Sequence, residues 1–361
     1  MEAQKIKIVH IIGKLDVGGA ERLILDLGRK LDKSRFDIQI VALKGSGALE
    51  REFAKAEVPV TVIEKRYLGD WSVIDRVADF LKREMPDIVH THLFIGDFWG
   101  GRAAKRAGIK HLVSTKHDVM HEGFIRRFFS KRYHRSVDRV VAISEATHNF
   151  LVKKEKVDPA RVPVIYNGID IAKFFVPNEK IFDSEEIVFG LVGRLSREKG
   201  QRYLLPALKL VKNTNWKLLI VGDGPERPVL EKQVKRLKFE DKVRFVGRQT
   251  DVRPALSEMD VFVLPSLSEG LSLAVIEAAA AGKFVIASAV GGVPEIVRDH
   301  ETGLLFKRAD IENLVASLNW VFDHREEAIP MAARLQASVA EKFDINNIIK
   351  QYEALYESLV A

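Results

Sequence analysis

The 361-residue sequence contains no cysteine. Disulfide bonds, zinc sites built on thiolates and cysteine nucleophiles are therefore excluded, and the composition fits a reducing compartment. Long apolar runs are also missing, since no segment approaches the roughly 20 residues that a transmembrane helix needs. The N-terminal residues lead directly into a short apolar segment, residues 6–12, so we expect no signal peptide and a cytoplasmic location.

Two glycine signatures of nucleotide-binding proteins are absent as well. A P-loop needs Gly-Lys-Ser/Thr where this chain has Gly18, Gly19 and Ala20, and the G-x-G-x-x-G dinucleotide pattern does not occur there. The missing glycine pattern disfavours a nicotinamide-dependent dehydrogenase.

The charge is moderately basic. There are 57 Lys and Arg against 50 Asp and Glu, for a formal net charge of +7. This excess indicates an anionic partner, such as a nucleotide, a nucleic acid or a membrane surface, without choosing among them. Hydrophobic content of 47% and charged content of 30% are typical of a globular protein, and the length suggests two domains.

Short apolar runs rich in β-branched residues alternate with helical patterns along the chain. We expect strands at residues 7–12, 38–43, 60–63, 88–91, 112–115, 140–143, 187–192, 218–221, 243–246, 261–264 and 284–287. This alternation predicts parallel sheets with helices on both faces. The rhythm breaks at 167–183 and restarts at Ile187, so we predict two doubly wound α/β domains with a cleft between them, followed by an amphipathic helix at 346–359.

Candidate ligand-binding residues follow the first strand of each predicted domain. Gly18 and Gly19 precede a helix, where glycine lets a ligand approach the backbone and free N–H groups can bind an anion. Arg194 and Lys199 lie in the loop after 187–192, where an open parallel sheet places its ligands and two cations suit a diphosphate. The alternative for Gly18 and Gly19 is a tight turn that binds no ligand. The alternative for Arg194 and Lys199 is two solvated charges.

Two glutamates stand in the nearly apolar stretch 266–288. Glu269 lies in a loop after the strand 261–264, and Glu277 lies eight residues later in an expected helix at 271–281. Because eight residues are a little over two helical turns, the two carboxylates would face roughly the same way. Buried carboxylates need partners, and vicinal hydroxyls of a ribose or hexose are suitable ones. The alternative is a structural pair and a loop charge.

Several histidines follow strands of the first domain. His117 and His121 are four residues apart, as zinc ligands on a helix would be, but no third ligand is evident and we predict no metal site. A polar histidine lining the cleft is the preferred interpretation of His117. His90, His92 and Asp97 follow another strand, and one of these histidines could belong to the core.

The segment 123–140 interleaves basic and aromatic residues, among them Arg126, Arg127, Phe128, Phe129, Lys131 and Arg132. This composition suits an anionic membrane surface. The alternative is a helix that buries its aromatic rings and solvates its arginines. No nucleic-acid-binding module is recognisable, so we expect no nucleic-acid partner.

Together these motifs resemble the retaining GT-B glycosyltransferases of family 4, also called group 1 glycosyl transferases. The matching segments are GGAER at 18–22, IYNGID at 165–170, GRLSREKG at 193–200 and the E-x7-E pair of Glu269 and Glu277, followed by GGVPEIV and TGLLF. The resemblance covers essentially the whole chain. It implies two Rossmann-like domains facing across a cleft: an acceptor-binding domain at 1–170 and a donor-binding domain at 171–340. A helix at 341–361 would cross back to the first domain.

The resemblance also implies roles for individual residues. Arg194 and Lys199 would hold the donor diphosphate, and Glu277 would bind the ribose hydroxyls. Glu269 would bind hydroxyls of the transferred sugar, with backbone N–H groups near Gly270, Leu271 and Ser272. Arg248 lies where the family contacts the base, Gly18 and Gly19 would meet the phosphates, and His117 matches the active-site histidine. His92, Asp97 and the loop 120–124 are the candidate acceptor contacts.

The implied activity is retaining transfer from a nucleotide diphospho-sugar, expected to be a UDP-sugar with GDP as the alternative. The acceptor would be a glycan or lipid-linked molecule of cell-surface polysaccharide or glycolipid synthesis, such as lipopolysaccharide or exopolysaccharide. Because no D-x-D motif is present, we expect no cofactor and no metal, with cations in the metal's place. Lipid-linked acceptors would favour peripheral association with the inner face of the membrane. Alternative functions are a GT-B-type UDP-sugar epimerase and a non-catalytic nucleotide-sugar-binding protein.

Overall fold

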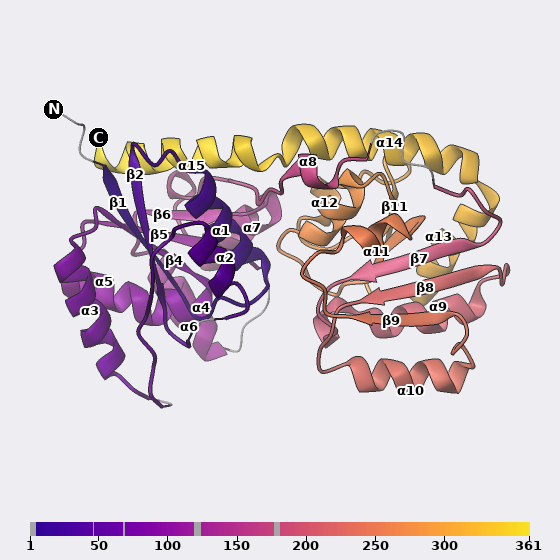
Figure 1. Cartoon of the computed structure of the whole chain (residues 1–361), viewed down its shortest axis with the longest axis horizontal. Helices are drawn as coiled ribbons and strands as arrows, with labels where there is room; N and C mark the ends of the chain where they lie inside the picture. The colour runs from indigo at the N-terminus through magenta and orange to yellow at the C-terminus, as the bar shows by residue number, and fades with distance from the viewer. Residues whose placement is uncertain (1–4, 46, 68, 119–123, 177–180) are drawn as a thin grey trace. The chain divides into compact units, whose positions relative to one another are not determined.

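The computed structural model describes residues 5–45, 47–67, 69–118, 124–176 and 181–361, with the backbone alone for 124–127. Two compact units make up the chain. Unit 1 comprises Met1–Gly168 and Ile345–Ala361, and unit 2 comprises Ile169–Asp344 (Figure 1). Each unit holds one six-stranded sheet, and all paired strands within it run parallel.

Unit 1 begins with alternating strands and helices and ends with the C-terminal helix of the chain. Its strands are β1 (Ile6–Ile12), β2 (Phe36–Ala42), β3 (Val60–Val62), β4 (Ile88–His92), β5 (His111–Lys116) and β6 (Arg139–Ala142). Its helices are α1 (Gly19–Lys30), α2 (Glu50–Lys55), α3 (Ser72–Glu84), α4 (Leu93–Ile95), η1 (Gly96–Gly100), α5 (Gly101–Ala107), α6 (Phe124–His134), α7 (Glu145–Phe150), η2 (Leu151–Glu155), η3 (Pro159–Arg161) and α15 (Ile345–Val360).

The strand order of unit 1 is β3-β2-β1-β4-β5-β6. The direction of winding reverses between β1 and β4, and ligands of such sheets bind beside the carboxyl ends of the strands at this switch point. Alternation along β1 divides its side chains between two cores. Ile8 and Ile12 pack with residues of α1, α2 and α15, whereas Val9 and Ile11 pack with residues of α3 and α5.

Unit 2 repeats this plan. Its strands are β7 (Ile187–Val192), β8 (Trp216–Val221), β9 (Val243–Gly247), β10 (Val261–Leu264), β11 (Phe284–Ser288) and β12 (Leu304–Phe306). Its helices are α8 (Ile171–Phe174), η4 (Arg197–Lys199), η5 (Gln201–Tyr203), α9 (Leu204–Leu210), α10 (Arg227–Leu237), α11 (Arg253–Ser257), α12 (Leu273–Ala280), η6 (Val293–Glu295), α13 (Ile311–Asp323) and α14 (Arg325–Lys342).

The strand order of unit 2 is β12-β11-β10-β7-β8-β9, so its switch point lies between β7 and β10. Both central strands are almost fully buried, as expected for parallel strands that are covered on both faces. The loops that follow them are the loops in which Arg194, Lys199 and Glu269 lie.

The prediction of two doubly wound α/β domains is confirmed. The C-terminal helix also behaves as the resemblance implied, because α15 buries Ile348, Ile349, Tyr352 and Tyr356 in the core of unit 1. The strand β12 was not expected from the sequence. Among the described residues, no helix is both long enough and apolar enough to cross a membrane.

Candidate functional site

Two loops meet at the switch point of unit 2. The loop after β7 spans 193–200, the loop after β10 spans 265–272, and the backbone N–H of Leu267 donates to the Glu198 carbonyl at 2.7 Å. Gly200 has a φ of +63°, and a Cβ atom there would lie 2.0 Å from the Pro265 carbonyl oxygen. Only glycine fits so close an approach in this conformation, so Gly200 joins the two loops.

A second glycine positions the same loop from the other side. Gly291 has a φ of +53°, and a Cβ atom there would lie 1.7 Å from the Glu269 carbonyl oxygen. The N–H of Gly292 also donates to the Gly270 carbonyl at 3.0 Å. Gly291 and Gly292, the first two residues of the GGVPEIV segment, thus hold the backbone of Glu269 in place.

Lys199 and Glu269 form the central ion pair of this site. Lys199 Nζ lies 2.8 and 3.0 Å from the two carboxylate oxygens of Glu269. Ser266 Oγ donates to Oε1 of the same carboxylate at 2.6 Å. The Glu269 side chain is only 6% exposed, whereas Lys199 is 30% exposed and therefore accessible to a ligand. A buried carboxylate requires this compensation.

Glu277 lies in α12, four residues beyond its first residue, and is buried. The helix begins at Leu273, two residues later than expected, and the N-cap residue Ser272 makes no capping bond with its side chain. The first N–H groups of the helix therefore have no side-chain cap. Such groups at a helix N-terminus favour an anionic or hydroxyl ligand.

The two predicted arginines are both exposed. Arg194 directly follows Gly193 after β7 and makes no salt bridge within the described chain, while its backbone carbonyl accepts from Gln201 Nε2 at 2.9 Å. Arg248 directly follows β9, which is separated from β7 by β8. The two arginines therefore follow different strands of the sheet, and both guanidinium groups are accessible to solvent.

The loop after β8, residues 222–226, packs against the loop after β7 and was not predicted as part of the site. Cβ atoms at Gly222 and Gly224 would lie 1.9 Å from the Gly193 carbonyl and 2.3 Å from the Leu195 carbonyl. The Leu195 N–H donates to the Asp223 carbonyl at 3.0 Å. The sequence signal was present in Gly222-Asp223-Gly224-Pro225, since two glycines and a proline directly after a strand mark a constrained turn.

In unit 1, the predicted glycines stand where α1 begins. Gly18 is the N-cap residue and is extended, with φ −152°, and its carbonyl accepts from the Arg22 N–H at 3.0 Å. Glu21 lies in the first turn, and burial raises its pKa to about 7, with a smaller contribution from Asp16. This glutamate was part of the GGAER motif, but we assigned it no role.

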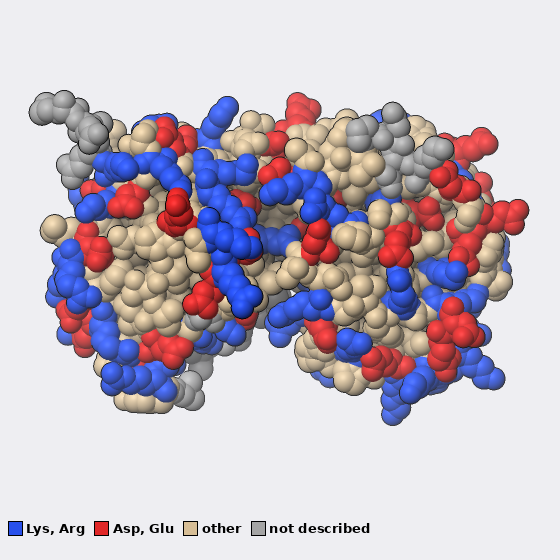
Figure 2. Space-filling view, in the orientation of Figure 1, with Lys and Arg blue, Asp and Glu red and all other residues tan. Residues whose placement is uncertain are grey.

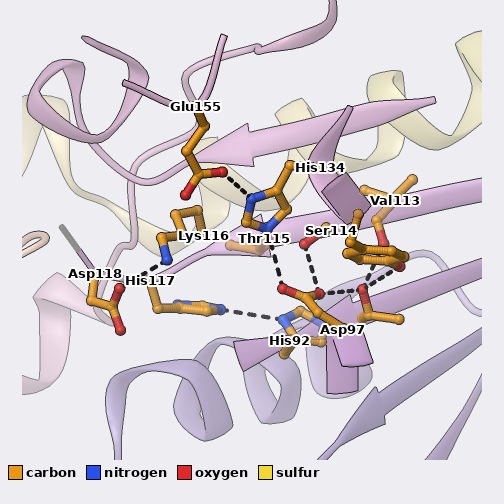
Figure 3. A network of polar contacts seen from close by, with 12 residues as sticks. His92, Asp97, Val113, Ser114, Thr115, Lys116, His117, Asp118, His134 and Glu155 are labelled. Atoms are coloured by element: carbon orange, nitrogen blue, oxygen red, sulfur yellow. Dashed lines mark hydrogen bonds and ion pairs between the residues drawn. The ribbon is translucent and has the colours of Figure 1, made fainter. Parts of the chain in front are cut away.

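His117 directly follows β5 and belongs to a chain of histidines. Its Nε2 lies 3.3 Å from Nδ1 of His92, and Nε2 of His92 lies 2.9 Å from Nδ1 of His10 (Figure 3 shows the first of these contacts). Burial lowers the pKa of His10 to about 3 and that of His117 to about 4, and it lowers the pKa of His92 well below its usual value. His10 lies inside the apolar strand β1 and was not predicted as a site residue.

Nitrogen atoms of His10, His90 and His92 lie within 4.8 Å of one another, so a metal ion must be considered. The rings, however, are stacked or moderately tilted, with interplanar angles of 23°, 31° and 35°. Rings in this arrangement do not direct three lone pairs at one point, as a metal requires. Both nitrogens of His90 are also engaged, with Tyr356 Oη at 2.8 Å and Thr115 Oγ1 at 2.7 Å. The cluster therefore fits a metal poorly.

Asp97, a candidate acceptor contact, faces the interior instead. It accepts from Thr91 Oγ1 at 2.6 Å and from Ser114 Oγ at 2.8 Å, and its other oxygen lies 3.2 Å from His134 Nε2 (Figure 3). His134 Nδ1 lies 2.5 Å from Glu155. Although burial opposes the charged form, the two carboxylates raise the pKa of His134 to about 9. Asp97 thus anchors α6 through His134, and we no longer consider it an acceptor contact.

The basic and aromatic segment forms α6, which borders a cavity of about 760 Å³ between α5 and α6. Cations from both helices and the residues after α6 line it: Arg102, Lys105, Lys131, Arg132 and Arg135. Burial lowers the pKa of Arg102 and of Lys105, and the charge of Arg132 lowers both further. The side chains of Arg126 and Arg127 lie outside the described residues, as do His121 and the loop 120–123.

Comparison with known proteins identifies the family. The family model for glycosyl transferases group 1 matches residues 173–337, and the model for glycosyltransferase family 4 matches residues 17–173. The UDP-Gal:alpha-D-GlcNAc-diphosphoundecaprenol alpha-1,3-galactosyltransferase of Escherichia coli is 28% identical, over 99% of this chain and 98% of the relative. The N-acetyl-alpha-D-glucosaminyl L-malate synthase of Bacillus anthracis is 30% identical, over 80% of this chain and 78% of the relative.

Solved structures agree on the fold. HepE from Anabaena, crystallised with UDP and glucose, superimposes with a TM-score of 0.88 at 22% identity, over 98% of this chain and 100% of that one. The lipopolysaccharide outer core galactosyltransferase WaaB in its apo form gives a TM-score of 0.78 at 20% identity, over 98% and 99% of the two chains. With its two doubly wound units and these full-length relatives, the chain belongs to the group 1 glycosyl transferases of glycosyltransferase family 4 and is a GT-B glycosyltransferase.

Proposed function

We propose that the protein transfers a sugar from a UDP-sugar to a hydroxyl group of a glycan or lipid-linked acceptor, with retention of anomeric configuration. The main support for a donor site in unit 2 is the Lys199–Glu269 ion pair at the switch point of its sheet. Known relatives support UDP: the E. coli enzyme is named for UDP-Gal, and HepE was crystallised with UDP and UDP-glucose.

Each donor group has a chemically suitable partner in unit 2. Lys199 and the exposed Arg194 bind the diphosphate, and the buried Glu277 accepts hydrogen bonds from the ribose hydroxyls. Glu269 accepts from hydroxyls of the transferred sugar, aided by N–H groups at Gly270, Leu271 and Ser272. Arg248 contacts the base. In unit 1, Gly18 and Gly19 stand at the start of α1, whose first N–H groups suit an anion such as a phosphate.

The chemistry consists of one substitution at the anomeric carbon. The bond from this carbon to the diphosphate oxygen breaks, and its electron pair goes to the leaving UDP. The acceptor oxygen forms the new bond on the same face of the sugar, and a phosphate oxygen takes its proton. Arg194 and Lys199 stabilise the charge that develops on the diphosphate, which is the role a divalent metal has in other transferases.

Glu269 serves as a binding group in this proposal. A retaining glycosidase needs two carboxyl groups about 5 Å apart that flank the scissile bond. Both carboxylate oxygens of Glu269 instead accept from Lys199 Nζ, and Oε1 also accepts from Ser266 Oγ. The charge of Glu269 is therefore compensated, and its orientation fixed, by protein groups. In this environment Glu269 is suited to accept hydrogen bonds from sugar hydroxyls, and the proposed reaction does not require it to form a covalent intermediate.

Release of UDP from a panel of UDP- and GDP-sugars tests this function. We expect wild-type protein to release UDP from at least one UDP-sugar in EDTA, and the product formed on a simple acceptor to keep the donor's anomeric configuration by NMR. An absolute requirement for a divalent cation, an inverted product or epimerised free UDP-sugar would each contradict the proposal.

We further propose that the acceptor is lipid-linked and that the cavity between α5 and α6 binds an anionic lipid head group. Figure 2 shows both basic and acidic side chains on the visible face of each unit, with some of the basic ones gathered in a band on unit 1. The residues that line this cavity, by contrast, include five cations and no carboxylate within the described chain. Phe128 at its border is 57% exposed, and cations beside an exposed aromatic ring suit a membrane interface.

Sedimentation with vesicles tests the lipid part separately. We expect binding to phosphatidylcholine vesicles that contain phosphatidylglycerol, and little binding to pure phosphatidylcholine. The double variant Lys105→Glu/Arg132→Glu should lose this binding. The matched control Lys235→Glu/Arg236→Glu makes the same charge change on exposed positions of α10 and should keep it. Equal losses in both variants, or binding that ignores vesicle charge, would contradict a specific site.

A further inference from the structure

Three imidazoles of unit 1 form a linear hydrogen-bonded chain. It runs from His117 through His92 to His10, with nitrogen–nitrogen distances of 3.3 and 2.9 Å. The two terminal nitrogens, Nδ1 of His117 and Nε2 of His10, are buried and have no hydrogen-bond partner among the described residues. The chain therefore has one unfilled position at each end.

The strands explain this arrangement. His10 in β1 lies opposite His90 in β4 in the sheet register, and His92 follows two residues later on the same face of β4. Thr115 pairs with His92 in the register of β4 and β5, which brings His117, two residues beyond it, next to His92 (Figure 3). All three rings thus lie at the carboxyl ends of β1, β4 and β5, beside the switch point of unit 1.

A neutral imidazole carries one N–H and one lone pair, so the two bonds of the chain are coupled. If Nδ1 of His117 carries the proton, its Nε2 accepts from Nδ1 of His92, and His92 in turn accepts from Nδ1 of His10. If Nε2 of His117 carries the proton, both bonds reverse. His117 therefore presents a donor at Nδ1 only when His10 presents an acceptor at Nε2.

We propose that His92 and His10 are positioning residues that fix the tautomer and ring orientation of His117. This rests on the proposed function, because it takes His117 as a ligand contact, as the family resemblance implies. His92 is buried between the other two rings, so its role passes through His117 and not through direct contact with substrate.

Nδ1 of His117 has no hydrogen-bond partner within the part of the chain that the structure describes, and it is therefore available to a ligand. A buried polar atom without a partner is costly, and a ligand hydroxyl can remove this cost because it can donate or accept. The tautomer shared by the three histidines determines whether the ligand hydroxyl must accept from Nδ1 of His117 or donate to it. Loss of His10 would free His92, and then His117, to adopt the other tautomer.

Nitrogen-15 NMR on histidine-labelled protein tests the coupling without any assay. Signals are assigned with His10→Asn, His92→Gln and His117→Gln. We expect His10, His92 and His117 to share one neutral tautomer near pH 7.5. Different tautomers among the three histidines, or a cationic ring in any of them, would overturn the proposed coupling of their tautomers. So would stoichiometric Zn²⁺ binding that shifts the signals of His10, His90 and His92 together.

Kinetics test the positioning role. Asparagine can place an amide near the Nδ1 position of His10, so His10→Asn should keep kcat close to wild type. His10→Leu should lower kcat about tenfold, the effect of one hydrogen bond, with KM for the donor less affected. His111→Leu, at the other end of β5, is the control and should leave kcat unchanged. Equal losses in the Asn and Leu variants would overturn the positioning role.

The two proposals fail in different ways. If wild-type protein is not stabilised by UDP and releases none, the proposed donor is wrong. The tautomer measurement still shows whether His117, His92 and His10 are coupled by hydrogen bonds. If UDP is bound and released while the three tautomers differ, only the positioning role is overturned.

Discussion

Lys199 and Glu269 come from loops after different strands, and their side chains meet in a bidentate ion pair with distances of 2.8 and 3.0 Å. The proposed ligands of diphosphate and sugar are thereby linked before any donor is present. A diphosphate that attracts Lys199 would leave Glu269 to be compensated by sugar hydroxyls. Binding of the nucleotide part and binding of the sugar part should therefore be coupled through this pair.

Replacement of Lys199 should reduce turnover more than donor affinity. We expect Lys199→Met to lower kcat about 100-fold, the scale of one preorganised group that stabilises developing charge, with a smaller rise in KM. Because Glu269 would lose its cation, the free energy of unfolding should also fall by about 1–3 kcal/mol. Steady-state kinetics and urea unfolding measure the two effects.

The control for this variant is Lys232→Met, the same change at an exposed position of α10. It should leave both quantities near wild type. Equal losses of kcat and of donor affinity in Lys199→Met would argue against stabilisation of the leaving group.

Gly291 should tolerate no side chain. Gly291→Ala places a Cβ atom against the Glu269 carbonyl in a conformation that already disfavours alanine, so the loop must shift. We expect loss of UDP-dependent thermal stabilisation together with lower stability. Gly108→Ala has a similar φ of +76° with open space around the new atom, and it should cost about 1 kcal/mol without affecting UDP. Similar behaviour of the two variants would contradict the close approach at Glu269.

Acid should destabilise the fold through the buried histidines. The pKa values of His10 and His117 are about 3 and 4 in the folded protein, against 6.5 when unfolded. The unfolded chain thus binds more protons below pH 6.5, so stability falls as the pH drops from 6.5 toward 4. Each group contributes about 2 kcal/mol of loss at pH 5. Urea unfolding from pH 5 to 8 should show a shallower slope for His10→Asn than for wild type. An unchanged slope would show that His10 is not held neutral.

Alkali should destabilise the fold through His134. Its folded pKa is raised to about 9, so its stabilising contribution is complete below pH 6.5 and is lost as the pH rises through 9. The contribution is up to about 3 kcal/mol. His134→Gln should be less stable than wild type at pH 6, and the difference should shrink by pH 9.5. A constant difference would contradict an imidazolium held between Asp97 and Glu155.

Much of the fold could be predicted because local patterns and long-range packing agree. Strands such as β7 and β10 are buried on both faces, so their whole sequence is apolar and their limits are clear. β12 has only three residues and was missed, although it pairs with β11 at the edge of the sheet. The first residue of α12 was placed too early because the apolar sequence continues through the loop that precedes it.

The polar clusters of unit 1 could be predicted only in part. His92 and His117 follow strands and attracted attention, but His10 lies inside an apolar strand and its partner is 82 residues away. Nothing near Asp97 in the sequence indicates that His134 compensates it or that Glu155 contacts the same histidine. Such contacts depend on the register between strands and on helix packing, which composition does not encode. In unit 2, short loops after adjacent strands converge by topology alone, and the prediction of the Arg194, Lys199 and Glu269 loops depended on this rule.

The most direct test of the account is thermal stabilisation by UDP in EDTA, for wild type, Glu277→Ala and the control Glu341→Ala, an exposed position of α14. At about 100 times its dissociation constant, UDP should stabilise wild type and Glu341→Ala by roughly 2.7 kcal/mol. Glu277→Ala should lose most of this gain. Equal stabilisation of all three proteins, or stabilisation by GDP and not by UDP, would contradict the donor site proposed for unit 2.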